Sequence, residues 1–227
     1  MSNQSTDLFI INSDSTAVAA GLVYSGLALL ILPIHMAVNL SILTSRTLRK
    51  NPLYILMLQI NFCDFGQVVF HMISGLFPIF PNLTERYQVL VRICGGTANS
   101  CWMAMFPIMC ILSISRVNVI RSNSTVVATK LPVYLKALLI LGWISSIVFW
   151  LLTILGQNFT FVEIGWTYDE TKPLTPILSQ LEYYICFPIL LISYIIYLLI
   201  VAHMIMVRLT GEKRVSSRNG RPSVLVV

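Results

Sequence analysis

The stretch from Arg49 to Phe80, RKNPLYILMLQINFCDFGQVVFHMISGLFPIF, decides the fold. It opens with two cations and then stays apolar over the length that crosses a bilayer, about 20 residues at helical rise. Asp64 lies near its middle, where a carboxylate costs about 2.5–3.5 kcal/mol and so faces protein or trapped water rather than lipid. Asn61, Asp64 and His71 follow the helical repeat along one face. This polar stripe predicts a membrane helix that other helices must cover.

The composition of the whole chain indicates an integral membrane protein. Of its 227 residues, 56% are hydrophobic and only 11% are charged, against roughly 25% charged in a soluble domain. The net charge of +6 does not indicate nucleic-acid binding, because the cations flank apolar runs, where they report membrane topology. The sequence has no C-x-x-C spacing, paired-histidine motif, phosphate loop or nucleophile–base pair. We therefore expect neither an enzyme nor a metal site.

Five apolar runs predict an all-α membrane protein, a bundle of five transmembrane helices that inserts in the lipid bilayer. Their expected bounds are about 17–44, 52–80, 92–120, 132–155 and 179–207. A polar, acidic segment at 1–16 precedes the bundle, and a basic tail at 208–227 follows it. We expect the tail to be flexible.

The distribution of charge predicts a plasma-membrane protein with its N-terminus outside the cell and its C-terminus in the cytoplasm. In this orientation the inner side holds all of the 15 Lys and Arg residues except Arg86, Arg92 and Lys172. The outer side would carry three N-x-[ST] sequons, which we expect to be glycosylated. They begin at Asn3, Asn82 and Asn158.

Each of the five spans contains one residue that is unusual for contact with lipid. In chain order these landmarks are Asn39, Asp64, Arg116, Trp143 and Pro188. The ordered set resembles the rhodopsin-like G-protein-coupled receptors. The phrase NPLYILMLQINFCDF, together with Ser-Arg-Val at 115–117, looks most like the divergent nematode serpentine chemoreceptors. The resemblance covers most of the chain, although each landmark match is one residue wide.

The resemblance implies a role for each landmark. Asn39, Asn61 and Asp64 would belong to a hydrated polar network in the helix core, often with a sodium ion near Asp64. Arg116 would face a heterotrimeric G protein, and Pro188 would bend the fifth helix beside the ligand cavity. A small environmental molecule would bind among the second, third and fifth spans. The residues expected at that pocket are His71, Thr97, Ser100 and Met105.

Three departures from the family bear on signalling. Ser115 replaces the acid that normally pairs with the arginine at 116. Cys94 stands where the family's outer disulfide begins, but no cysteine occurs in 157–178, so this thiol is either half of a disulfide or free. The family's sixth and seventh helices have no counterpart before Val227. We therefore expect a receptor cut short after its fifth helix, which binds weakly, assembles with a full-length receptor or is degraded.

Other function classes remain open at this stage. In a small transporter or channel subunit, Asn61, Asp64 and His71 would form an ion or proton path, although the chain has neither an internal repeat nor paired broken helices. In a scaffold or a non-signalling partner of a full-length receptor, no ligand would bind. Asp64 itself is either a switch or ion site, or a neutral carboxyl group that is hydrogen-bonded to a neighbouring helix. His71 either lines an outward pocket or caps the stripe.

Overall fold

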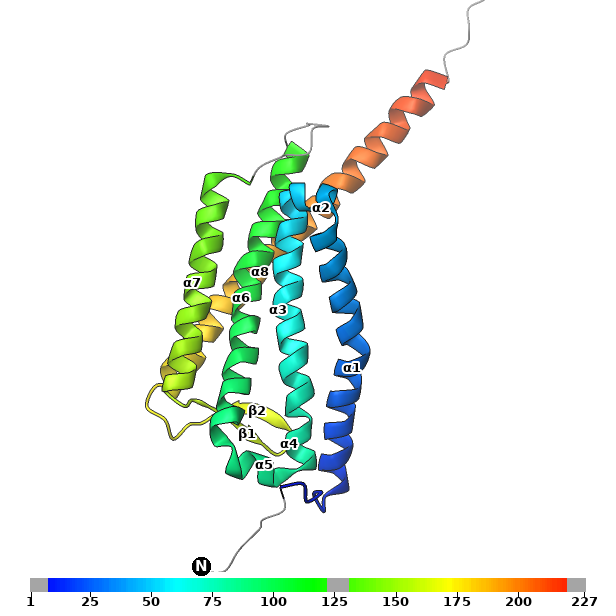
Figure 1. Cartoon of the computed structure of the whole chain (residues 1–227). Helices are drawn as coiled ribbons and strands as arrows, with labels where there is room; N and C mark the ends of the chain where they lie inside the picture. The colour runs from blue at the N-terminus through cyan, green and yellow to red at the C-terminus, as the bar shows by residue number, and fades with distance from the viewer. Residues whose placement is uncertain (1–7, 122–130, 220–227) are drawn as a thin grey trace, which may run out of the picture.

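The computed structural model describes residues 8–121 and 131–219, and the side chains of residues 8–120 and 131–208. Its described part is built on five long helices (Figure 1). Each of them, α3 together with the short α4 that follows it, is long and apolar enough to cross a membrane, which confirms the predicted five-helix membrane class. They are α1 (Ser15–Thr44), α3 (Pro52–Ser74), α6 (Gln88–Arg121), α7 (Val133–Leu155) and α8 (Thr175–Asn219).

Local capping explains where the first helices begin. Asp14 accepts a hydrogen bond from the Thr16 amide at 2.9 Å ahead of α1. Asn51 does the same for the Leu53 amide at 3.0 Å ahead of α3. These side-chain oxygens satisfy amides that have no partner inside the helix. Between the two helices, the short α2 (Arg46–Lys50) forms the predicted basic turn.

Two boundaries differ most from the predicted spans. The third and fifth spans begin at Gln88 and Thr175 rather than near 92 and 179. At its other end α8 continues through Asn219, so the first part of the predicted basic tail is helical. The backbone continues the apolar helix because the residues from 208 to 219 include no proline to end it.

The remaining short elements gather at one end of the bundle, which we call the hairpin end (bottom of Figure 1). It contains α4 (Leu76–Ile79), α5 (Pro81–Arg86) and a hairpin of β1 (Phe159–Val162) and β2 (Gly165–Tyr168). The two strands are antiparallel, and Phe161 pairs with Trp166. The basic α2 lies at the opposite end of the bundle (Figure 1).

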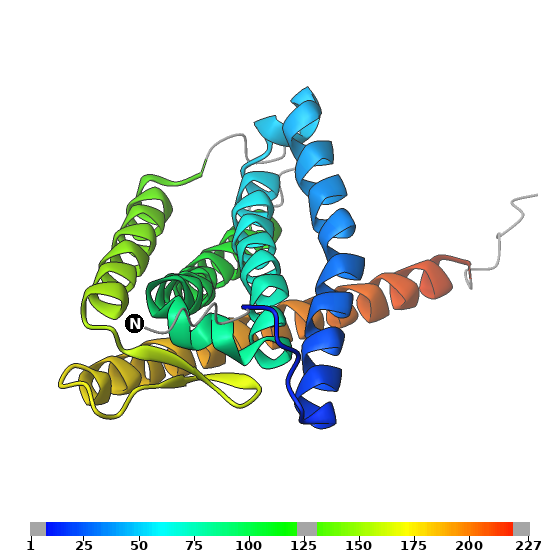
Figure 2. The ribbon, with the colours of Figure 1, turned by 60° about the horizontal axis from the view of Figure 1, so that its bottom comes forward.

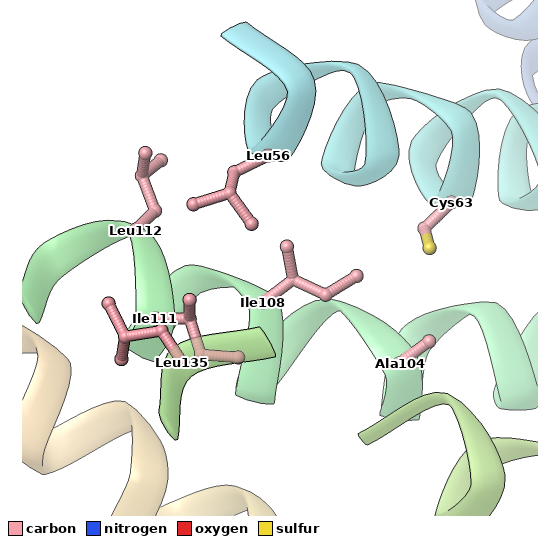
Figure 3. Packing of buried hydrophobic residues seen from close by; sticks show 7 residues of the cluster. All are labelled: Leu56, Cys63, Ala104, Ile108, Ile111, Leu112 and Leu135. Atoms are coloured by element: carbon pink, nitrogen blue, oxygen red, sulfur yellow. The ribbon is translucent and has the colours of Figure 1, made fainter. Parts of the chain in front are cut away.

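Helix α6 is the centre of the fold. It packs against α3, α7 and α8, and 44% of its most apolar window is buried, against 11–22% in the other four spans. Figures 1 and 2 show α8 crossing the bundle obliquely. The largest buried cluster joins α3, α6 and α7 (Figure 3) and is entirely apolar apart from one thiol. It consists of Leu56, Cys63, Ala104, Ile108, Ile111, Leu112 and Leu135.

Two glycines allow neighbouring helices to approach closely. A Cβ atom added at Gly21 of α1 would lie 2.4 Å from the carbonyl oxygen of Gly75, which ends α3. A Cβ atom at Gly142 of α7 would lie 3.0 Å from Cγ of Pro107 in α6. Membrane helices associate through small residues of this kind, because packing rather than water exclusion holds them together.

Candidate functional site

A cavity of about 310 Å³ opens at the hairpin end, between α3, α6, α8 and the β-hairpin. We call it the hairpin-end cavity. Its volume is at the lower end of the range of ligand pockets, about 300–1,000 Å³. The cavity is lined by apolar and aromatic groups together with four polar side chains. The polar residues are Gln67, His71, Asn99 and Glu182.

Glu182 of α8 is the centre of a hydrogen-bonded cluster in this lining. The Asn99 amide of α6 donates to Glu182 Oε2 at 3.1 Å and lies 3.3 Å from the Tyr168 hydroxyl of β2. The Tyr168 hydroxyl donates to the same Oε2 in a short hydrogen bond. Burial, followed by this bond to Glu182, raises the pKa of Tyr168, so the phenol keeps its proton at neutral pH. Two neutral donors therefore converge on one carboxylate oxygen.

Two other polar side chains of the cavity have unpaired atoms. Gln67 Nε2 and His71 Nδ1 are buried, and neither has a hydrogen-bond partner among the described residues. The His71 ring stacks against Tyr24 of α1, with 6.2 Å between the ring centroids. An unpaired buried polar group costs about 1–3 kcal/mol. Both atoms are covered by the surrounding protein, so either side chain would have to turn before a molecule in the cavity could bond to its unpaired atom.

Trp166 of β2 forms the hairpin side of the cavity and holds the hairpin on the bundle. Its indole Nε1 donates to Ser74 Oγ of α3 at 3.0 Å. Its ring lies directly over Gly95 of α6, where an added Cβ atom would be 2.5 Å from the ring. Phe77 and Phe161 meet the indole edge-on, at 6.0 Å and 5.2 Å between centroids. Glycine at position 95 is needed because the indole rests on the helix backbone.

Cys94 is a free, buried thiol, so the disulfide implied by the family resemblance is wrong here. All five cysteines lie within the described residues, and all are unpaired. Cys94 is buried with Phe77 and Val91, and Trp166 packs against this group. The hairpin offers no cysteine as a partner. Aromatic packing and one indole hydrogen bond therefore connect it to α3 and α6.

The polar stripe of α3 is divided between two environments. Asn61 pairs with His35 of α1: its amide donates to the His35 carbonyl at 3.0 Å, and its Oδ1 lies 2.5 Å from His35 Nδ1. His35 is also near enough to the half-buried Asp64 to interact with it electrostatically. Asn39 Oδ1 has no hydrogen-bond partner in residues 8–121 and 131–219, and Asn39 lines a separate cavity beside Trp143. The structure therefore brings His35, rather than Asn39, to Asn61 and Asp64.

Arg116 lies far from the hairpin end, in the last turns of α6. Its guanidinium carbon is 5.6 Å from the centroid of the Tyr197 ring of α8, which is a cation–π contact. The Ser115 hydroxyl donates to the Ile111 carbonyl of its own helix at 2.7 Å, so it does not act as a partner of Arg116. Pro188 lies inside α8, where its ring removes one intrahelical hydrogen bond.

Of the four residues expected at a ligand pocket, His71 lines the hairpin-end cavity and the other three do not. The Thr97 hydroxyl accepts a hydrogen bond from the Trp150 indole of α7 at 3.0 Å. The Ser100 carbonyl accepts one from α7 at 2.7 Å. The helical repeat accounts for this placement, because the cavity is lined by positions 95, 98, 99 and 102 of α6. Met105 is likewise absent from the lining.

The Asn158 sequon is not available for glycosylation in this fold, so that prediction is wrong. Asn158 is fully buried. Its amide donates to the Leu152 carbonyl at 3.2 Å, and its Oδ1 accepts from the Thr175 hydroxyl at 3.1 Å, which joins α7 to the start of α8. Asn82 lies half-buried in α5 at the hairpin end. Asn3 lies outside the described residues.

Sequence reasoning missed Glu182, Asn99 and the anchoring role of Trp166. Glu182 could have been found, because the rule that singled out Asp64, an acid within an apolar span, applies equally to it. Asn99 carried no such signal, since amides are common among the polar residues of this span. Trp166 could not have been paired with Ser74, which is 92 residues away in sequence.

No family model matches the chain, and no curated protein matches its sequence. The features that bear on function are the geometry of the hairpin-end cavity, the five apolar spans and the landmark residues that the spans carry.

Proposed function

We propose that the chain is a serpentine chemoreceptor-like protein, related in plan to the first five helices of a rhodopsin-like receptor, and that it binds a small environmental molecule. The binding site is the hairpin-end cavity. The observation that carries the proposal is that one cavity combines aromatic walls with four polar side chains, among them the carboxylate of Glu182. Ligand pockets typically combine apolar walls with a few convergent polar groups of this kind.

The proposed orientation in the plasma membrane places the cavity on the outer side. The hairpin and the start of α1 lie at one end of the bundle, and the basic turn of α2 lies at the other (Figure 1). Cationic turns mark the cytoplasmic side of membrane proteins. A water-soluble molecule would then reach the cavity without crossing the bilayer.

Helix α6 is the proposed route from the ligand to a heterotrimeric G protein. It carries Asn99 and Trp102 in the cavity lining and Arg116 near its other end. At 1.5 Å per residue, Trp102 and Arg116 are about 21 Å apart along the helix. Helix α8 accompanies α6 over this distance, with Glu182 at the cavity and Tyr197 against Arg116. A molecule that binds between α6 and α8 would change how the two helices pack at the cavity, and this change would extend to their contact at Arg116.

The contacts of α3 favour this proposal over transport along its polar stripe. Asn61 is hydrogen-bonded to His35 of α1, whereas His71 belongs to the cavity lining. The two ends of the stripe therefore have different partners. In a transporter or channel subunit, charge movement would depend on pH and would be abolished by Asp64→Asn.

Ligand-dependent stabilisation of the purified chain in lipid nanodiscs tests the proposal. A thiol-reactive dye reports unfolding, because Cys63 and Cys94 are buried in the folded state. A library of small volatile and water-soluble compounds is screened for those that raise the unfolding midpoint, as binding to the native state requires. The variant Ala98→Leu narrows the cavity. The variant Ala137→Leu makes the same change on the exposed surface of α7 and is its matched control.

We expect some compounds to stabilise the wild type and Ala137→Leu but not Ala98→Leu. A library in which no compound stabilises the wild type, or in which every active compound stabilises all three proteins equally, would contradict the proposed site.

A further inference from the structure

Glu182 is a carboxylate without a cation. It is the acidic residue among those that line the hairpin-end cavity, and the lining includes no Lys or Arg. Its hydrogen bonds within the described residues come from two neutral groups, the Asn99 amide and the Tyr168 phenol. No ion pair compensates its charge in the part of the chain that the structure describes. Glu182 is half-buried, and a carboxylate that is partly withdrawn from water without a counter-charge is costly.

The two oxygens of Glu182 are in different situations. Both protein donors bind Oε2, and no donor from the described residues binds Oε1. A carboxylate offers about four acceptor positions, two on each oxygen. The cluster thus fixes the carboxyl group through one oxygen and leaves the other for a molecule in the cavity.

Aromatic side chains supply the apolar walls around this carboxylate. Trp102 comes from α6, Phe159 from β1 and Trp166 from β2. Aromatic faces attract cations within about 6 Å, and tryptophan does so most strongly. A carboxylate that has no cationic partner and is surrounded by aromatic rings is suited to bind an organic cation.

Three other charged groups near the hairpin end belong to a separate pocket. Glu85, Arg92 and Asp169 line a neighbouring cavity of about 300 Å³, which shares Phe159 with the hairpin-end cavity. Arg92 is therefore not placed as the counter-charge of Glu182. The charge balance of the hairpin-end cavity has to come from what binds in it.

We propose that the hairpin-end cavity binds a small organic cation, a protonated amine with an aromatic or apolar body, and that Glu182 is its counter-ion. This inference rests on the proposed function and specifies the chemical class of its ligand. The ammonium group donates to Glu182 Oε1, and the body of the molecule packs against Trp102 and Phe159. Charge-assisted hydrogen bonds of this type are about twice as strong as neutral ones.

Amines and alcohols of matched shape test this assignment. The probes are a panel of amine–alcohol pairs, led by phenethylamine and phenethyl alcohol, which share an aromatic body and differ in charge. Binding to the chain in nanodiscs is measured by the dose dependence of the unfolding midpoint. The variant Glu182→Gln keeps an oxygen for Asn99 and Tyr168 but removes the charge. The variant Glu170→Gln makes the same change at an exposed residue outside the cavity.

We expect the wild type and Glu170→Gln to bind the amine of at least one pair at least about tenfold more tightly than its alcohol, the difference made by one charge-assisted hydrogen bond. Glu182→Gln should lose this preference while it keeps its affinity for the alcohol. Equal binding of amines and alcohols by the wild type, which does not depend on any variant folding, would overturn the assignment. So would a preference that survives in a folded Glu182→Gln protein. If neutral compounds nevertheless bind in a manner that Ala98→Leu abolishes, the receptor proposal stands and only the cationic ligand class is wrong.

Discussion

The hairpin end and the core cluster of Figure 3 are built on the same two helices, α3 and α6, and they treat polar groups in opposite ways. In the core cluster, Leu56 and Ile108 are buried among apolar side chains, and nearby Ser113 donates to its own helix at 2.8 Å. At the hairpin end, Gln67 and His71 each keep an unpaired buried atom. The core cluster is the part of the bundle that we expect to provide stability, and the hairpin end is the part that we propose takes a ligand.

The largest effect is expected in the core cluster. Leu56 is 1% exposed and lies between α3 and α6. Leu56→Ala should lower the free energy of unfolding by about 2–5 kcal/mol, because it leaves a cavity that the helices cannot close. Denaturant titration in detergent measures the loss. Leu30, which is 72% exposed, is the matched control position. Leu30→Ala should change the free energy of unfolding little. Equal losses at both sites would mean that the cluster is not the stabilising core.

An intermediate effect is expected where the hairpin meets the bundle. Trp166→Ala removes the hydrogen bond to Ser74 and the contact with Gly95. The cost should be about 2 kcal/mol, less than the roughly 3–5 kcal/mol of a fully buried aromatic residue, because Trp166 is half-buried. Hydrogen exchange should show the loss concentrated in β1 and β2. Uniformly faster exchange across all the helices would instead show that the hairpin supports the whole fold.

A pair of amide substitutions sharpens the comparison further. Gln67→Leu removes a buried amide whose Nε2 has no partner, so stability should be unchanged or higher by about 1 kcal/mol. Asn61→Leu removes an amide that bonds His35 through both of its polar atoms, and this should cost about 1–3 kcal/mol. Thermal unfolding measures both changes, as the shift of each variant's unfolding midpoint from that of the wild type. A clear loss in Gln67→Leu would show that its amide is satisfied in the unliganded protein.

The smallest effect concerns pH at the loop after β2. The Thr171 hydroxyl and then the Thr171 amide donate to Asp169 Oδ1, at 2.6 and 3.0 Å, and together they hold the pKa of Asp169 below its usual value. A lowered pKa stabilises the fold above the unfolded-state value of about 3.9, and the contribution is lost as pH falls through and below that value. The difference in unfolding midpoint between wild type and Thr171→Val should therefore shrink on acidification. If the difference did not change with pH, Thr171 would stabilise the protein by a route other than the lowered pKa of Asp169.

The apolar spans were predictable because hydropathy over about 20 residues depends on composition alone. The spans of α1 and α7 begin and end close to their expected bounds. The hairpin was not predictable in the same way, because its strands are four residues each. Its order comes from Trp166 packing on Gly95, a contact between residues far apart in sequence.

The candidate site was predictable only in part, for a related reason. His71 was expected to line a pocket or to cap the stripe, and it does line the cavity. Thr97 and Ser100 were expected beside it, but both hydroxyls donate to their own helix, and both residues accept a hydrogen bond from α7. A sequence gives the spacing of polar residues on a helix but not the rotation of that helix toward its neighbours. Glu182 could have been predicted by the rule used for Asp64, which singles out an acidic residue within an apolar span. Its partner Tyr168 could not, because it lies outside the spans.

The free thiol of Cys94 beneath Trp166 has a consequence for where and how the protein matures. A disulfide forms only in an oxidising compartment, and its formation or reshuffling takes seconds to hours. The hairpin is instead held by an indole hydrogen bond and ring contacts, which form as quickly as side chains dock. Docking of the hairpin over the hairpin-end cavity is therefore independent of the redox state of its surroundings, and reducing agents that open disulfide-bonded proteins should leave this cavity intact.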